Sequence, residues 1–256
     1  MNGIFANIKM SATQQLGGGI LALFFDYLLK IFYLLPMIFL WRAIAAGGAD
    51  LGGFTLEGLL TYTCVSSILS PMLNVQCDAV SWRYDGVIID YYRRPQTIMG
   101  QLVNSTVGKW IPELMLYGAP LTLILLICGV NMRPATLMFV PCLVLAVSLG
   151  FAVDFLFTCF IIRLKNATWM AHSIRSAVTL LFSGAVIPFA LLPFGIGRVF
   201  ALLPFGSLAA APLAVYAGMQ SPLEAIGLQL FWSALLWPLA ILAFAKNSEW
   251  MVSYGG

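Results

Sequence analysis

Charge and histidine are scarce in this sequence. Only 9% of its 256 residues are charged, and a single residue, His172, is histidine, whereas about a quarter of an ordinary soluble domain is charged. So few charges cannot cover the surface of a soluble protein of this size, and a disordered chain requires the opposite balance. The lone histidine argues against a histidine-based metal site. The net charge of +3 is too small to favour a nucleic-acid partner.

Other signatures are absent as well. The five cysteines have no paired spacing and are interpreted as small apolar residues within helices. The phosphate-binding pattern Gly-x-x-x-x-Gly-Lys-Ser/Thr does not occur, so any use of ATP would need an ATPase on another chain. No nucleophile–base pair and no set of metal ligands stands out. The sequence therefore assigns no catalytic residue, metal or cofactor to this chain.

Apolar residues dominate instead, at 61% of the chain, with a mean hydropathy of +0.94. Only helix bundles and closed barrels can span a bilayer, and long unbroken apolar runs are typical of helices rather than of alternating barrel strands. The first run is also too long for the apolar part of a cleavable signal peptide. We predict an all-α polytopic membrane protein with six transmembrane helices. The spans are expected at residues 20–45, 56–77, 107–130, 135–162, 174–192 and 225–245.

Two segments differ from the spans. Residues 1–19 carry apolar side chains such as Ile4 and Phe5 at helical spacing, which predicts an amphipathic helix in the inner headgroup plane. That helix would be either a passive anchor or a contact with a cytoplasmic partner. Residues 193–222 are apolar but interrupted by proline and glycine, which favours short re-entrant helices on the extracellular face before the last span. All of residues 20–256 would then form a single transmembrane domain.

The distribution of Lys and Arg predicts the orientation. With the N-terminus inside, only Arg42, Arg133 and Arg198 of the 13 Lys and Arg residues lie on the outer side. Because positive residues accumulate in short cytoplasmic loops, both termini are expected in the cytoplasm. The longest hydrophilic stretch, residues 78–104, is then a cytoplasmic loop.

Three acidic residues lie away from the ends of the predicted spans and need partners, because charge at membrane depth is costly. Asp26 lies one helical turn before Lys30, so the two are expected to pair, with contact to the N-terminal helix as an alternative. Glu113 follows Lys109 at the same spacing and either pairs with it or faces a cavity for a cationic substrate. Asp154 has no base within one turn. It either hydrogen-bonds a neighbouring span or, like Glu113, is a candidate for the translocation path.

The loop after the second span is the most informative segment. Between Asp78 and Gln101 it combines charged residues with Trp82 and several tyrosines. Such residues are enriched at protein interfaces, but Trp and Tyr also rest at lipid headgroups. Composition alone leaves both a docking surface and a headgroup-bound loop open.

This loop resembles the cytoplasmic loop of ABC-2 type permeases, the membrane subunits of ABC exporters. In that family a glycine is followed nine positions later by a proline, as Gly86 is by Pro95, with an acidic residue between them near the place of Asp90. A weaker similarity lies around Trp41 and residues 52–62. The family also has a proline- and glycine-rich series before its last span, which here comprises Ser183-Gly184, Pro188, Pro204-Phe205, Pro212 and Gly218. The patterns occur in the family's order over nearly the whole chain, most like the stand-alone permeases encoded apart from their ATPase.

The resemblance implies an ATP-driven exporter. Two six-helix permeases, either two copies or this chain with a paralogue, would sit among the lipids of a bacterial cytoplasmic (inner) membrane. Two ATPase subunits would hold the ATP and Mg²⁺, and alternating access would move an amphipathic or hydrophobic substrate outward. The expected coupling residues are Trp82, Arg83, Asp85, Gly86, Asp90, Arg93, Arg94 and Pro95. The expected outer-gate residues are Pro193, Pro204, Phe205 and Pro212.

Three other classes remain as alternatives. A secondary transporter or channel often has two halves with broken helices at matching places, but the proline-rich stretch before the last span has no counterpart in the first half. An intramembrane enzyme would need a catalytic constellation that is missing. A non-transporting membrane scaffold would differ only in its independence of ATP hydrolysis.

Overall fold

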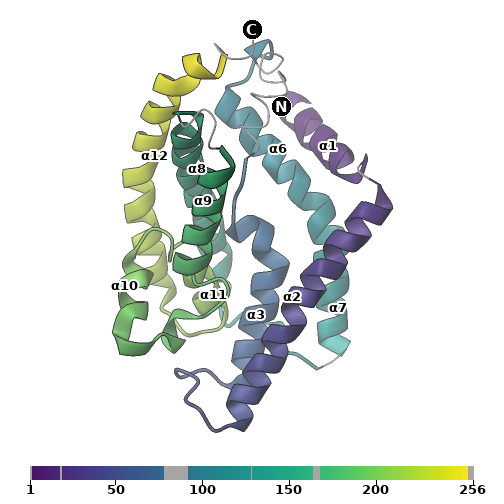
Figure 1. Ribbon diagram of the computed structural model, residues 1–256, viewed down its shortest axis with the longest axis vertical. Coiled ribbons are helices and arrows are strands. Elements are labelled where there is room, and N and C mark those ends of the chain that lie inside the picture. The colour runs from purple at the N-terminus through teal and green to yellow at the C-terminus, as the bar shows by residue number, and fades with distance from the viewer. Residues whose placement is uncertain (1, 18, 78–91, 128, 164–167, 253–256) are drawn as a thin grey trace.

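The computed structural model describes residues 2–17, 19–77, 92–127, 129–163 and 168–252 (Figure 1). All regular secondary structure in these ranges is helical. The longer helices are α1 Asn2–Gly17, α2 Ile20–Ala46, α3 Leu56–Leu73, α6 Ile98–Glu113, α7 Ala119–Ile127, α8 Phe139–Arg163, α9 Thr168–Phe182 and α12 Pro222–Val252. The shorter elements are the π-helix Leu114–Gly118 between α6 and α7, the 3-10 helices Phe189–Leu191 and Pro193–Gly195, α10 Ile196–Leu202 and α11 Ala210–Tyr216.

Four helical stretches of the described chain are long and apolar enough to cross a membrane. They are Leu23–Ala46, Ile98–Ile127, Phe139–Ile161 and Pro222–Asn247, and they correspond to the first, third, fourth and sixth predicted spans. The third starts earlier than predicted because Thr97 caps α6. Its Oγ1 accepts the backbone N–H of Gly100 at 3.2 Å, so the helix begins before the apolar run does.

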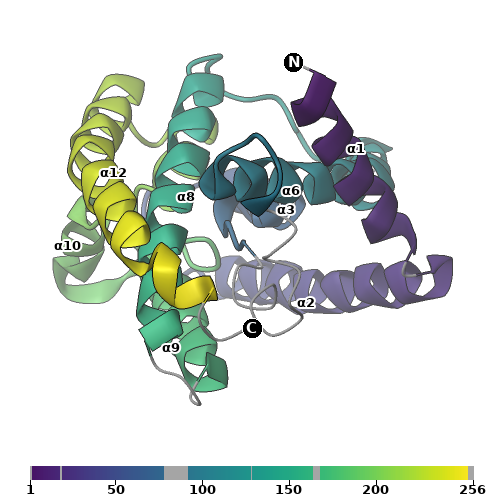
Figure 2. The same ribbon diagram turned by 90° about the horizontal axis from the view of Figure 1, so that it is seen from above.

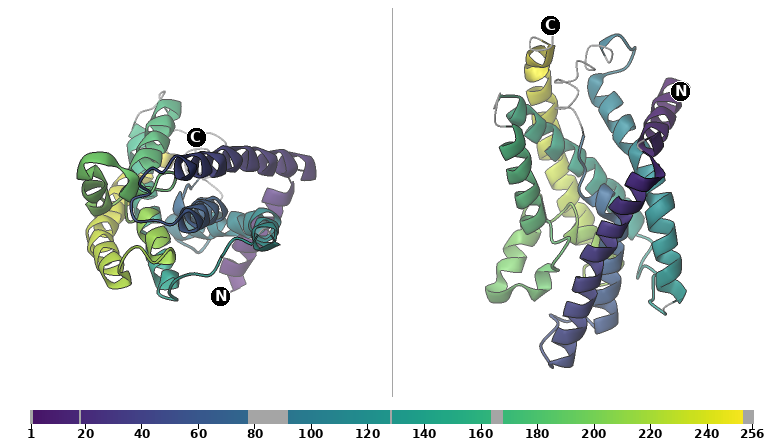
Figure 3. Two further views of the ribbon diagram at one scale, coloured as in Figure 1. Left: turned by 90° about the horizontal axis from the view of Figure 1, so that it is seen from below. Right: turned by 45° about the vertical axis from the view of Figure 1, so that its right-hand side comes forward.

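The predicted second and fifth spans correspond to α3 and α9, which run beside the long helices (Figures 1 and 3). α3 contains several buried Thr and Ser residues, and Ser66 donates to the carbonyl of Ala185 at 2.6 Å. Because α3 faces protein, it needs no fully apolar surface. The predicted end of the fifth span was wrong. α9 stops at Phe182 because Gly184 has a φ of +71°, a left-handed conformation that terminates helices.

The helices form a bundle with two distinct ends. α1 and the C-terminal end of α12 lie at one end, called here the terminal end, whereas α10, α11 and the α2–α3 connection lie toward the opposite, or far, end (Figure 1). α8 lies between α12 and α6 (Figure 2). Its Phe155 packs on Phe244 of α12 with ring centroids 5.5 Å apart, and its Phe151 packs on Trp110 of α6 at 5.8 Å. α8 is accordingly the most buried of the four apolar stretches and α2 the least.

α1 packs on α6 with its polar side chains inward. Asn7 and Ser11 are only 6% and 1% exposed, and Ser11 hydrogen-bonds Ser105 at 3.1 Å. A Cβ on Gly108 would lie 2.5 Å from the carbonyl oxygen of Ile8, so only glycine permits this approach. The apolar residues Ile4 and Phe5 are 45% and 66% exposed. Small and polar residues between helices with apolar residues outside is the pattern of packing in lipid.

Candidate functional site

A buried ion pair contacts the backbone directly before the predicted coupling loop. One carboxylate oxygen of Asp154 in α8 lies 2.9 Å from a guanidinium nitrogen of Arg175 in α9. The other carboxylate oxygen accepts the backbone N–H of Cys77 at 2.9 Å, and Arg175 also donates to the carbonyl of Val75. Asp154 and Arg175 are 2% and 5% exposed. The pair therefore joins α8 and α9 to the backbone that leads out of α3.

The sequence did not reveal Arg175 as the partner of Asp154, because Arg175 lies on the next helix. The charge distribution had placed Arg175 among the cytoplasmic cations, whereas α9 begins at Thr168 and carries it back alongside α8. The geometry agrees with the structural alternative for Asp154, a polar contact with a neighbouring helix. A role for Asp154 in the translocation path stays a prediction.

The coupling residues themselves are only partly described. Trp82, Arg83, Asp85, Gly86 and Asp90 lie outside the described residues. The remaining three residues are Arg93, Arg94 and Pro95. They are exposed and lie directly before α6. A guanidinium nitrogen of Arg94 lies 3.5 Å from the side-chain oxygen of Asn7. The N-terminal helix α1 thus contacts the described part of the predicted coupling segment.

A second ionic cluster lies between α2 and α6. Lys30 pairs with Glu113, and its ammonium is 3.4 Å from a carboxylate oxygen of Asp26. The same ammonium lies 5.7 Å and 5.3 Å from the ring centroids of Tyr27 and Tyr117, which favours its charge through cation–π attraction.

The Asp26–Lys30 pair was predicted, but the expected partner of Glu113 was wrong. Lys109 lies one turn before Glu113 on the same helix, yet the carboxylate contacts Lys30 of α2. A sequence pattern detects pairs within one helix, whereas this pair forms between two helices. With Lys30 beside it, the charge of Glu113 is compensated inside the protein, so the geometry does not favour a carboxylate reserved for a cationic substrate.

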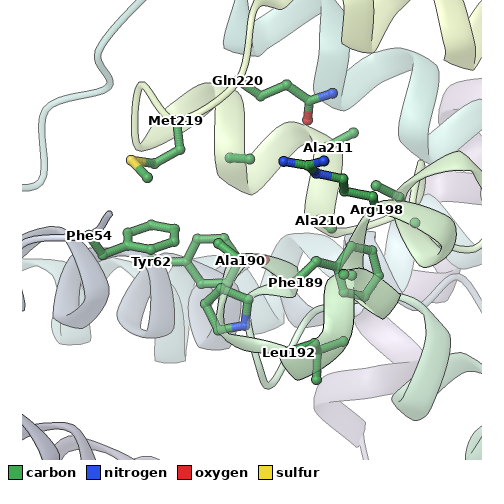
Figure 4. A pocket seen from close by; sticks show the side chains of 16 residues that line it. Phe54, Tyr62, Phe189, Ala190, Leu192, Arg198, Ala210, Ala211, Met219 and Gln220 are labelled. Carbon is green, nitrogen blue, oxygen red and sulfur yellow. The ribbon is translucent and has the colours of Figure 1, made fainter. Parts of the chain in front are cut away.

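A pocket of about 540 Å³ lies among the elements of the far end (Figure 4). We call it the far-end pocket. Its walls come from the start of α3, the segment after α9, and α10 and α11 with the turn that follows them. The residues that line it are Phe54, Tyr62, Pro188, Phe189, Ala190, Leu192, Gly195, Gly197, Arg198, Ala201, Gly206, Ala210, Ala211, Ala214, Met219 and Gln220. None of them is acidic.

The predicted outer-gate residues lie in the segment around this pocket without lining it. Pro193 begins a 3-10 helix, and Pro204 lies in the turn between α10 and α11. The ring of Phe205 packs between Phe182 and Phe157, with centroids 6.4 Å and 6.5 Å away. Pro212 is buried within α11. Their role as a gate stays a prediction.

No metal site is evident within the described ranges, where no group of three or more His, Cys, Asp or Glu side chains could hold an ion. Cys64, Cys142 and Cys159 are buried within α3 and α8, whereas Cys77 is buried in the segment that follows α3.

The long apolar helices, the buried ion pairs and the lipid-type packing of α1 define a polytopic helical membrane protein. The sequence profile of the ABC-2 family of transporter proteins matches residues 31–255. The chain belongs to that family, as the sequence predicted, and is a membrane component of an ABC transporter. No curated protein gives a significant match to the chain.

Proposed function

We propose that the chain is the membrane-spanning permease subunit of an ATP-driven exporter in a bacterial cytoplasmic membrane. The family match over residues 31–255 carries the proposal. α2, α3, the α6–α7 stretch, α8, α9 and α12 would form six spans with both termini in the cytoplasm. The position of α3 and α9 beside the four long apolar helices supports this count (Figure 3). The Lys and Arg bias supports the orientation.

The terminal end is the proposed docking surface for two ATPase subunits, which would bind ATP and Mg²⁺. Arg93, Arg94 and Pro95 are exposed there, and α1 contacts them through Asn7. Residues 82–90 would complete this surface.

Movement of the coupling loop would reach the bundle through the backbone of residues 75–77. Asp154 and Arg175 hydrogen-bond this backbone at Cys77 and Val75. Because the two side chains belong to α8 and α9, a displacement of the loop would pull on both helices together. ATP-driven closure of the ATPases would in this way shift the population between inward- and outward-open bundles.

The exporter would contain a second permease, either another copy or a paralogue. α2 supports this by exposing a large apolar face, with Phe25, Phe32 and Phe39 each more than half exposed. Such a face fits lipid or another bundle. An amphipathic or hydrophobic substrate would pass between the two permeases and leave at the far end.

The proposal is tested by isolating the tagged chain from its native cells in mild detergent and identifying what accompanies it by mass spectrometry. We expect a stoichiometric P-loop ATPase, and the presence or absence of a second six-helix protein separates a heterodimer from a homodimer. If the chain is recovered alone, or only with itself, in gentle lipid discs, the proposal fails and a secondary transporter or a scaffold becomes the better reading.

A further inference from the structure

We infer that the far-end pocket binds an anionic amphiphile, a molecule with a phosphate or carboxylate head and an alkyl tail. The inference gives the chemistry of a ligand that the proposed function leaves unnamed, and its biological meaning rests on that function. The binding itself requires only this chain.

The positive charge of the pocket indicates the head group of the ligand. Arg198 reaches into the pocket from α10 (Figure 4). No acidic side chain lines the pocket, and no ion pair of Arg198 occurs within the described part of the chain. A guanidinium offers a planar fork of donors that matches carboxylate and phosphate oxygens. The amide of Gln220 lies on the same pocket and can add a further hydrogen bond.

The apolar walls of the pocket indicate the alkyl tail of the ligand. Phe54 and Met219 lie across the pocket from Arg198, and Leu192 and Phe189 form another side (Figure 4). A volume of about 540 Å³ with apolar walls and few polar groups is typical of small-molecule sites. A small inorganic anion would leave these walls without a partner, whereas an alkyl chain would cover them. The combination of one cation and an apolar pocket therefore indicates an amphiphile.

The pocket is built in advance of any ligand. Tyr62 donates its hydroxyl to the carbonyl of Gly184 at 2.7 Å. A Cβ on Gly52 would lie 2.6 Å from the carbonyl oxygen of Ala190, and one on Gly197 would collide with the carbonyl of Phe189. These contacts hold residues 184–190 firmly between the start of α3 and α10. A preformed site avoids much of the ordering cost of binding.

The test compares two probes with the same tail and opposite heads, dodecyl phosphate and dodecyltrimethylammonium. The purified chain in phosphatidylcholine nanodiscs is titrated with each, and binding is measured by the rise in unfolding temperature. Dodecyl phosphate is expected to bind about tenfold more tightly or better. Arg198→Gln should remove that preference, and Arg198→Lys should keep most of it. Arg133→Gln is the matched control, an exposed arginine between α7 and α8 that does not line the pocket, and it should change nothing.

Equal binding of the two probes, or an unchanged preference in Arg198→Gln, would overturn the inference. Native mass spectrometry of the chain from phosphatidylglycerol-containing discs separates two sources of the anion. Retention of phosphatidylglycerol that is lost in Arg198→Gln identifies a resident membrane lipid. Binding of dodecyl phosphate without retained phosphatidylglycerol identifies a free amphiphile, and hence a class of exported substrate. Since neither measurement involves an ATPase, this inference and the proposed function can fail separately.

Discussion

At the scale of single residues, we expect substitutions of Asp154 and Arg175 to have the largest effect on the structure. Each contacts the other and also a backbone group of residues 75–77, at a depth where both are almost fully buried. Removing one partner of a buried pair leaves an uncompensated charge, which is far more costly than removing both. The pair is therefore expected to be sensitive to the position of the charges as well as to their presence.

We predict that Asp154→Asn destabilises the protein by about 3–5 kcal/mol, because Arg175 is left without its counter-charge. The exchange Asp154→Arg with Arg175→Asp should not restore stability. In the exchanged pair the base would face the Cys77 N–H and the acid the Val75 carbonyl, so both backbone bonds would be lost. Thermal unfolding in detergent measures the effect.

Asp26→Asn is the matched control for this experiment. The Asp26 side chain is 58% exposed, and Lys30 keeps Glu113 as a partner when Asp26 is neutralised, so the loss of this exposed ion pair should cost less than about 1 kcal/mol. Full recovery in the exchanged pair would show that the backbone contacts contribute nothing. A stable Asp154→Asn with altered substrate-stimulated ATPase activity would instead favour a role in the translocation path.

The partner of Glu113 can be tested by a double-mutant cycle. Lys30→Met and Glu113→Gln are expected to couple by roughly 0.5–3 kcal/mol, the range for residues in one ionic network. The parallel cycle with Lys109→Met should give a smaller coupling, because the carboxylate contacts Lys30. Unfolding free energies of the wild type and the five variants supply both values. A larger coupling to Lys109 would contradict the structure.

At the scale of helices, apolar runs predicted the existence of each long helix better than its ends. α2 matches its prediction closely at residues 20–46, since the run starts and stops with the helix. α6 begins earlier because a threonine cap, which carries no hydrophobic signal, sets its start. α9 ends earlier because a left-handed glycine stops a helix within apolar sequence. Caps and stops are local backbone events, and hydropathy does not report them.

The contact of α1 with α6 gives a prediction at this scale. Gly108→Leu should displace α1, because a Cβ there meets both the Ile8 carbonyl and Ser11. Disulfide formation between Ser11→Cys and Ser105→Cys, whose hydroxyls are 3.1 Å apart in the native protein, measures the contact. We expect at least about a tenfold loss of cross-linking.

The control substitution is Gly227→Leu in α12, where an added Cβ has nothing within 4 Å. It should leave the cross-link unchanged. Undiminished cross-linking in Gly108→Leu would mean that α1 does not depend on this close approach.

At the scale of the whole molecule, the proposed ATPase docking surface and the far-end pocket lie toward opposite ends of the bundle. The described part of the coupling segment, residues 93–95 directly before α6, lies with α1 at the terminal end, and the proline-rich segment with its pocket lies toward the far end (Figure 1). The sequence predicted this division from charge bias and proline placement. It could not predict which groups meet, because the Asp154–Arg175 pair, the Lys30–Glu113 pair and the far-end pocket each form between different helices.

Reversing the charges of the coupling segment tests whether this segment forms the ATPase docking surface. Asp90→Arg with Arg94→Glu should abolish transport-coupled ATP hydrolysis while leaving membrane insertion intact, since these residues lie in the proposed docking surface. ATPase activity of the reconstituted complex is measured with and without transport. Asp50→Arg with Arg133→Glu applies the same reversal at exposed residues of the far end and should remain coupled. Normal coupling in the first variant would remove this loop from the docking surface.

The Asp154–Arg175 pair also constrains how the chain is integrated during synthesis. α8 is synthesised before α9, so Asp154 reaches the translocon ahead of Arg175. A lone carboxylate at the centre of a span opposes partition into lipid by about 2.5–3.5 kcal/mol on insertion scales. The arrival of Arg175 removes that penalty, so we expect α8 and α9 to enter the bilayer as a helical hairpin. The same pair that supports the finished bundle would then couple the insertion of these two helices.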